Sequence, residues 1–257
     1  MSGHSKWATI KHKKGAADAT RGKLFAKLIR QVEVAAREGG ADPEMNPTLR
    51  TMYQKARSAS VPLDTIQKAI KRGSGALEGV KYETVSYEGY APSGVAVIVE
   101  CLTDNRNRTG PDVRTVFSKL GGSMAEPGAV AWQFDRKGVI VVPKNAASVA
   151  NGQLSEDELM EVALEAGAED LADQGDTWQL TSGPSDLHQV VKALEDAGIA
   201  YDSADLTMLA SQTVPLDNET DARKVLRLID GLEDLDDVQN VYANFDIPDA
   251  ILETVMA

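Results

Sequence analysis

The hydrophobic and polar positions of the first eighty residues follow a helical period. Apolar side chains recur one helical turn apart from about Arg21 to the paired glycines at Gly39. A second stripe begins at Asn46-Pro47, where asparagine is a good cap and proline suits the first turn. A third runs from Val61 to Gly73. The pattern therefore predicts a small bundle of three short amphipathic helices.

From about Tyr82 onward, strand-like runs alternate with helical ones. The expected strands are 84–90, 95–102, 130–134, 138–142, 178–181, 204–209 and 238–245. The expected helices begin at Thr109 or Pro111, at Ser155, at Ser185 and at about Thr220. Ser155 and Glu158 have the spacing of a capping box. Strands mixed with helices in this order favour an α+β class, with helices on one face of each sheet.

The same order predicts a division of the chain into three domains. Residues 1–78 form a basic arm and the helical bundle, and the glycine-rich stretch 73–79 is interpreted as a linker. The segment 136–206 can close as a βαββαβ, ferredoxin-like unit. Its neighbours 79–135 and 207–250 then form one discontinuous α+β domain. The expected fold is α+β, with an acidic domain inserted in another.

Charge is distributed very unevenly along the chain. The net charge is −12 overall, yet residues 1–75 carry +9 and the other 182 residues carry −21. The first thirty residues set eight cations against Asp18: Lys6, Lys11, Lys13, Lys14, Arg21, Lys23, Lys27 and Arg30. A basic arm on an acidic chain predicts a polyanionic partner, and nucleic acid is the commonest polyanion in a cell.

The arm also contains groups that can contact bases. Trp7 is expected to stack on an exposed base, and His4 and His12 to contact phosphate or bases. The alternative is a solvated tail with Trp7 packed onto the bundle. Arg106 and Arg108 form a second, smaller basic point, for which a helix-capping loop and a ligand contact are equally acceptable interpretations. The acidic run Glu233 to Asp237 is interpreted as a solvated helix end.

No catalytic, metal or cofactor site is recognisable in the sequence. The three histidines lack ligand-like spacing, Cys101 has no cysteine partner, and no phosphate-binding glycine loop is present. Cys101 lies in an apolar run and is expected to be a buried strand residue. No apolar run is long enough for a membrane span and no secretory signal is visible, so the expected location is the cytoplasm.

Long stretches of the chain resemble the YebC family. They include MSGHSKWATIKHKKGAADATRGKLFAKLIR, VPLDTIQKAIKRGSG, YEGYAPSGVAVIVECLTDNRNRT and VAWQFDRKGVI, and the resemblance covers at least residues 2–140. It implies a three-domain cytoplasmic protein without enzymatic activity or cofactor. It also assigns the family's GHSKW segment to Gly3, His4, Ser5, Lys6 and Trp7, and its basic helix to 21–30.

The resemblance leaves more than one function open. Members are described as DNA-binding transcription regulators, and others resemble translation factors, among them the mitochondrial translational activator of cytochrome oxidase subunit I. The first hypothesis is a DNA-binding regulator of transcription. The alternative is a factor that binds ribosomal RNA on the ribosome and relieves stalling at proline runs. The third is a protein–protein adaptor that uses the acidic domains. The residues leave the oligomeric state open.

Overall fold

The computed structural model describes residues 18–145 and 154–256. The described chain forms two compact units. One comprises the chain up to Trp132 together with the part from Gln212 onward, and the other is Gln133–Ser211. Both contain an antiparallel four-stranded sheet with helices, and the first also contains a helical bundle. The α+β class expected from the sequence is confirmed.

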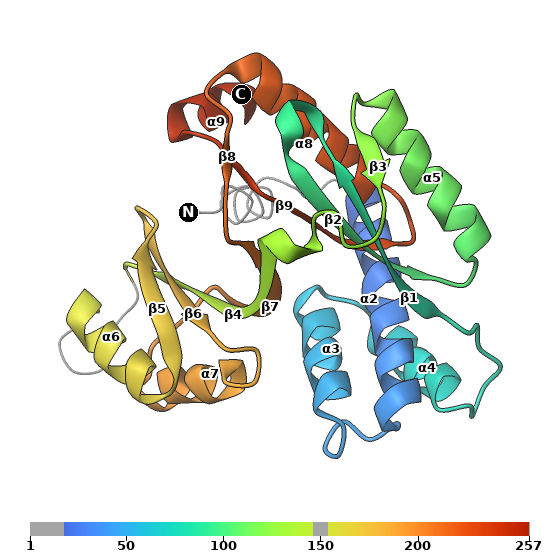
Figure 1. The fold of residues 1–257 in the computed structure, drawn as a ribbon. Helices are drawn as coiled ribbons and strands as arrows, with labels where there is room; N and C mark the ends of the chain where they lie inside the picture. Colours follow the sequence, from blue (N-terminus) through green and yellow to red (C-terminus); the bar gives the residue numbers. More distant parts are fainter. Residues whose placement is uncertain (1–17, 146–153, 257) are drawn as a thin grey trace. The chain divides into compact units, whose positions relative to one another are not determined.

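The bundle consists of three helices with α2 between its two neighbours (Figure 1). They are α2 (Asp18–Gly39), α3 (Pro47–Ser58) and α4 (Leu63–Gly73). The Asn46 side chain caps α3 by accepting from the Leu49 backbone N–H at 3.0 Å. Gly73 permits close packing of α4 on α2, because a Cβ there would lie 2.2 Å from the Glu33 carbonyl oxygen. Val32, Leu49 and Ile66 form the fully buried centre of the bundle.

The sheet of the first unit has the strand order β3-β1-β2-β9. Its strands are β1 (Glu83–Tyr90), β2 (Ala96–Thr103), β3 (Ser123–Ala125) and β9 (Val238–Ala243). One face packs on α5 (Arg106–Lys119) and α8 (Glu219–Glu233), with Phe117 and Ile229 fully buried between the layers. The β8 (Val214–Pro215) and β10 (Phe245–Asp246) strands form a short parallel pair, and α9 (Asp249–Met256) follows. Two 3-10 turns, 92–94 and 131–133, precede β2 and β4.

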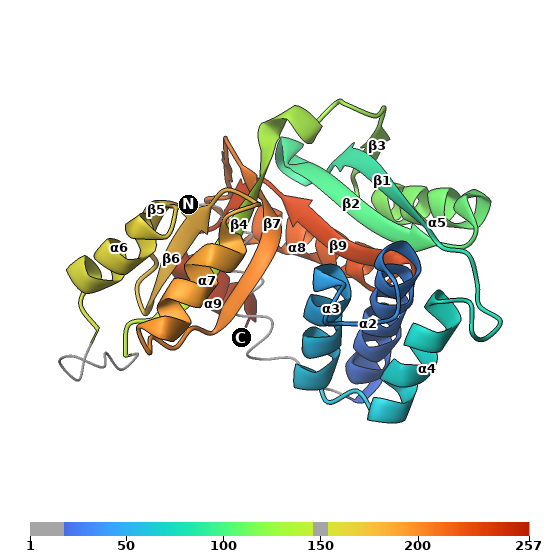
Figure 2. The ribbon, with the colours of Figure 1, turned by 90° about the horizontal axis from the view of Figure 1, so that it is seen from below.

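The second unit has the order βαββαβ and the strand order β5-β6-β4-β7, which is the ferredoxin-like arrangement. Its elements are β4 (Phe134–Pro143), α6 (Glu156–Glu165), β5 (Ala168–Asp173), β6 (Thr177–Ser182), α7 (Leu187–Asp196) and β7 (Ser203–Ala210). Both helices pack on one face of the sheet, where Leu159, Leu180 and Leu194 are buried. The capping box at Ser155 and Glu158 is present. In Figure 2 the sheets and helices of each unit can be followed from a second direction.

Several predicted boundaries were wrong for identifiable reasons. Helix α5 begins at Arg106 and carries Pro111 in its interior, because Asn105 caps it. Residues 131–133 form a 3-10 turn where a strand was expected. The α7 cap is Asp186 and not Ser185. The sequence pattern missed β3, β5 and α9, which are short or only partly buried.

Within the described ranges, 18–145 and 154–256, no helix has the length and apolar character that crossing a membrane requires.

Candidate nucleic-acid interface

Most of the predicted contact residues precede the described part of the chain. His4, Ser5, Lys6, Trp7, Lys11, His12, Lys13 and Lys14 lie outside it. Arg21 lies in the first turns of α2, but its side chain is also outside the described atoms. The geometry of five predicted residues can therefore be described: Lys23, Lys27, Arg30, Arg106 and Arg108.

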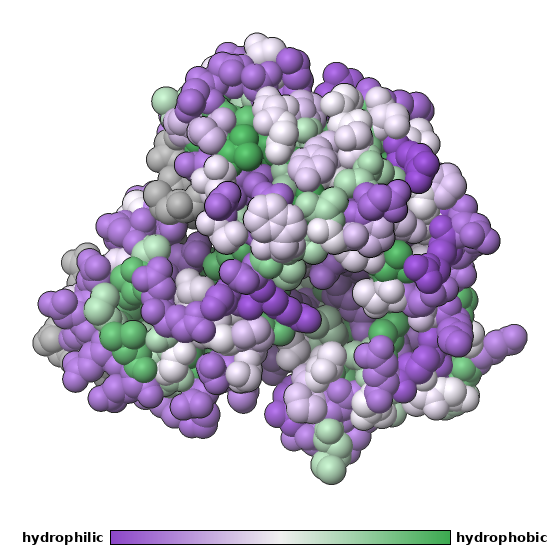
Figure 3. Space-filling model, in the orientation of Figure 1, coloured by the Kyte–Doolittle hydropathy of each residue, from purple (hydrophilic) through white to green (hydrophobic). Residues whose placement is uncertain are grey.

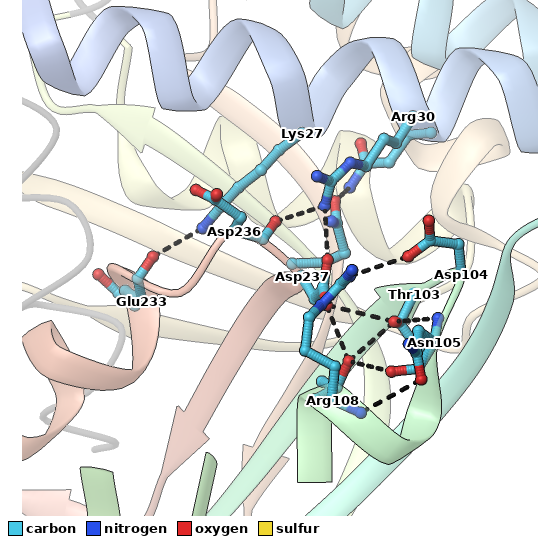
Figure 4. A network of polar contacts seen from close by, with 12 residues as sticks. Lys27, Arg30, Thr103, Asp104, Asn105, Arg108, Glu233, Asp236 and Asp237 are labelled. Carbon is cyan, nitrogen blue, oxygen red and sulfur yellow. Dashed lines mark hydrogen bonds and ion pairs between the residues drawn. The ribbon is translucent and has the colours of Figure 1, made fainter. Parts of the chain in front are cut away.

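Lys23, Lys27 and Arg30 of α2 contact the acidic end of α8 and the segment that follows it. Figure 4 shows the contacts of Lys27 and Arg30. The Lys27 Nζ donates to the Glu233 carbonyl oxygen at 2.8 Å. The Arg30 Nη1 donates to the Asp236 carbonyl oxygen at 2.6 Å. The end of a helix carries unsatisfied carbonyls and partial negative charge, so it attracts cations. The part of α2 from Lys23 to Arg30 is thereby held against the α8–β9 segment.

The three contacts differ in how strongly they engage each cation. Lys23 pairs with Asp234 at 2.9 Å, but both side chains are well exposed, and such pairs contribute about 0–1 kcal/mol. Lys27 is half-buried, and this burial lowers the pKa of its amine while Glu233 opposes the shift. Arg30 is also half-buried and lies over the Tyr82 ring, with 5.8 Å between guanidinium carbon and ring centroid. Lys27 and Arg30 are therefore structural contacts, whereas Lys23 stays accessible to a partner.

Asp237 is the centre of this junction. Its Oδ1 accepts from Arg30 at 3.1 Å, and its Oδ2 accepts from Arg108 at 2.7 Å. The hydroxyls of Thr103 and Thr109 donate to the same Oδ2 at 3.2 and 2.8 Å. Burial alone would raise the pKa of the Asp237 carboxyl, but the bonds from Arg108 and Thr109 outweigh it and lower the pKa.

The second basic group, Arg106 and Arg108, mainly makes contacts within its own domain. Asn105 caps α5 by accepting from two backbone N–H groups, which agrees with the capping interpretation of this loop. Arg108 also pairs with Asp104 at 2.8 Å, and its hydrogen bonds to Asp237 and Asp104 raise the pKa of its guanidinium further above its usual range. Arg106 is exposed and lies 3.7 Å from Glu83. Of the two, Arg106 is the one that remains open to a ligand.

The structure thus brings Arg30 and Arg108 together on one carboxylate that sequence reasoning missed. The run from Glu233 to Asp237 was interpreted as a solvated helix end, and for Asp237 this is wrong, because only 7% of its surface is exposed. One feature of the sequence could have indicated this burial: the next residue, Val238, begins an apolar strand. A carboxylate one residue before a buried strand lies at the edge of the core.

The described residues hold no group of three or more histidine, cysteine or acidic side chains arranged for a metal ion. Cys101 is a buried strand residue, as expected, and burial raises the pKa of its thiol to about 12. A thiol with that pKa is protonated at neutral pH and is a poor nucleophile.

Comparisons with known proteins agree over nearly the whole chain. Residues 5–76 match the model of the TACO1/YebC protein N-terminal domain, and residues 82–245 match that of the TACO1/YebC second and third domain. A protein of Saccharopolyspora erythraea named "Probable transcriptional regulatory protein" is 58% identical over the full length of both chains. One of the same name from Rubrobacter xylanophilus is 57% identical over 99% of each.

A solved structure is also similar. The crystal structure of a conserved hypothetical protein from Aquifex aeolicus has 48% sequence identity and a TM-score of 0.82, covering 95% of this chain and 98% of that one. With two family models matching consecutive parts of the sequence, the chain belongs to the TACO1/YebC family.

Proposed function

We propose that this chain is a non-enzymatic, DNA-binding regulator of transcription that acts in the cytoplasm. The observation that carries the proposal is the segregation of charge between the parts of the fold. Residues 1–75 carry +9, whereas the inserted unit 133–211 has four cations against fifteen acids, a net −11. A phosphate backbone is attracted to the first part and repelled by the second. The relatives' printed names support the same role.

One face of the described chain suits a partner recognised by charge. Hydrophilic residues cover most of the face drawn in Figure 3, and its apolar residues are scattered. The large apolar side chains exposed on the described bundle are Leu24, Met45 and Leu63. Three such side chains provide little apolar area for docking a protein.

Binding to ribosomal RNA is the second candidate, and the docking of α2 favours it. A helix that reads a major groove must present one long face to the bases. Lys27 and Arg30 are held by Glu233, Asp236 and Asp237, so the basic half of α2 is not free to do so. Contacts from the arm to a phosphate backbone remain, and they suit folded RNA as well as DNA.

A salt titration of binding tests the proposal. The probes are a labelled DNA duplex and an RNA hairpin of equal length, measured by fluorescence anisotropy. Affinity should fall linearly with salt on logarithmic axes, and charge reversal at Lys11, Lys13 and Lys14 should reduce the slope by at least about 3. Tighter binding to the duplex supports a DNA regulator, and tighter binding to the hairpin supports the RNA candidate. An affinity unchanged by the charge reversal would rule out the arm.

A further inference from the structure

We propose that the helical bundle contributes a second phosphate-binding surface, formed by three cations of α3 and α4. These α3–α4 cations are Arg57, Lys68 and Lys71. The inference rests on the proposed function, since it assumes a nucleic-acid partner. It adds to the arm a group of residues that the sequence predictions did not include.

Several cations of the bundle are already engaged by other groups of the protein. Lys27 and Arg30 hold the end of α8. Arg37 and Arg72 both pair with the buried Glu33, at 3.3 and 2.9 Å. Arg50 pairs with Glu44 and donates to two backbone carbonyls.

The α3–α4 cations differ from these engaged residues. Within the described part of the bundle, the α3–α4 cations have neither an ion pair nor a side-chain hydrogen bond to the protein. All three side chains are exposed. Their charge is therefore compensated by water and salt alone, and a phosphate can replace these without breaking a protein contact.

The α3–α4 cations lie on the solvent-facing sides of their helices. Helix α4 buries Ile66 and Ala69 in the bundle core. Lys68 and Lys71 are exposed and three residues apart, so they are neighbours on the outer side of the helix. Arg57 lies in the last turn of α3, a few residues before α4 begins. Asp64 is the one exposed acid of α4, and three cations outnumber it.

The chemistry of these side chains suits a phosphate backbone. Lysine offers a point charge on a flexible stem and binds phosphate without fixed geometry, which suits a repeating backbone. The arm, with its four lysines from Lys6 to Lys14, belongs to the same +9 segment. An acidic protein is the alternative partner. Its negative charges are less dense and less regularly spaced than those of a phosphate backbone.

The test compares two triple variants that remove the same charge. The first is Arg57→Gln with Lys68→Gln and Lys71→Gln. The matched control is Arg114→Gln with Lys119→Gln and Arg227→Gln, exposed cations of α5 and α8. With the same duplex and hairpin, the first variant should lower the logarithmic salt slope by about 2–3 and weaken binding roughly 10–100-fold near 0.1 M salt. The control should leave the slope unchanged.

The possible results separate this inference from the proposed function. If arm variants reduce binding but the two triple variants behave alike, the α3–α4 surface is refuted and the function stands. If the unmodified protein shows no salt-dependent binding, both are refuted. Equally tight binding of polyglutamate at the same salt would assign the surface to an acidic protein instead.

A second measurement uses the unmodified protein and does not depend on the variants folding. Lys68 and Lys71 should become protected from acetylation when the probe is bound, by at least about threefold relative to Lys119 and Lys192 on other elements. Equal reactivity of all four lysines with and without probe would refute the surface.

Discussion

At the scale of single residues, the most informative group is the Asp237 carboxylate. It accepts hydrogen bonds from Arg30, Arg108, Thr103 and Thr109 while its side chain is almost fully buried. A buried charge is tolerated only when it is paired and hydrogen-bonded in this way. The residue therefore links α2, the start of α5 and the start of β9.

Asp237→Asn should destabilise the protein by about 1–3 kcal/mol, because the amide cannot pair with both guanidinium groups and its NH₂ faces donors. Urea unfolding at neutral pH measures the change. Asp234→Asn removes an exposed partner of Lys23 and should change the free energy of unfolding by less than about 1 kcal/mol. Equal effects of the two substitutions would contradict the assigned role of Asp237.

The same carboxylate predicts a dependence of stability on pH. Because the folded-state pKa of Asp237 is lowered, its stabilisation is complete above the ordinary value of about 4 and is lost as the pH falls through the lowered folded value. The difference in unfolding free energy between wild type and Asp237→Asn should thus be constant from neutral to mildly acidic pH and shrink below about pH 4. A difference that grows on acidification would contradict this assignment.

Glu88 fixes the loop that precedes the inserted unit. Its carboxylate accepts from the backbone N–H groups of Gly128, Val130 and Ala131 at 2.6–2.9 Å. Burial raises the pKa of this carboxyl, but the three backbone donors outweigh it and lower the pKa. The sequence did not reveal this role, because the donors lie 40 to 43 residues further along the chain, in an irregular segment.

Glu88→Gln should cost about 1–3 kcal/mol, since the amide NH₂ is placed against a backbone donor and leaves it unsatisfied. Differential scanning calorimetry of the full chain measures the loss. Glu126→Gln, an exposed acid in the same loop, serves as the matched control and should leave the melting temperature close to wild type. Two indistinguishable melting curves would show that Glu88 does not hold the loop.

At the scale of elements, α2 has two different tasks. It packs in the bundle through residues such as Leu28, Val32 and Ala36, and Lys27 and Arg30 attach it to the α8–β9 segment. Apolar periodicity predicted the first task well. It could not predict the second. A lysine or arginine on the polar side of a helix gives the same sequence pattern whether its side chain faces solvent or contacts a carbonyl far away in the sequence.

Lys27→Gln with Arg30→Gln should loosen the part of α2 around these two residues. Hydrogen exchange of its backbone amides from 23 to 30 should become roughly tenfold faster, equivalent to about 1.4 kcal/mol of lost protection. Lys68→Gln with Lys71→Gln, the same change in charge on the same bundle, should leave this exchange rate unaltered. Acceleration in both double variants, or in neither, would contradict the assignment of Lys27 and Arg30 as the contacts that dock α2.

The elements also show which structural features the sequence pattern predicts and which it misses. Caps with side-chain chemistry were predicted well, as at Asn46 and at Ser155 with Glu158. Helix α5 was started too late because Pro111 was interpreted as a first-turn residue, although Asn105 already supplied a cap. Short or partly exposed strands such as β3 and β5 carry too little alternation to be detected.

At the scale of the whole molecule, the inserted unit enters and leaves the chain at one place. Its first and last strands, β4 and β7, pair antiparallel along their length. At their ends the Ser211 backbone N–H donates to the Gln133 carbonyl oxygen at 2.8 Å. The unit also has its own apolar core. Domains with adjacent ends and an independent core are commonly able to fold alone.

The fragment 133–211 should therefore unfold cooperatively in isolation, as measured by circular dichroism during urea titration. Replacing the same segment in the full chain by a short glycine-serine linker should remove a net charge of −11 and tighten binding to the probes. An isolated fragment without a cooperative transition would show that the unit depends on the rest of the chain. Weaker binding by the shortened chain would contradict the electrostatic role assigned to the unit.

The positively charged N-terminal part of the chain is expected to contact nucleic acid, and the acidic unit is not. Photo-crosslinking of the full-length protein to the labelled probes, with mass spectrometry of the adducts, tests it directly. Adducts should map to the arm and the bundle, within residues 1–75, and should be absent from 133–211. Adducts concentrated in the acidic unit, or none under conditions where the probe is bound, would contradict the account.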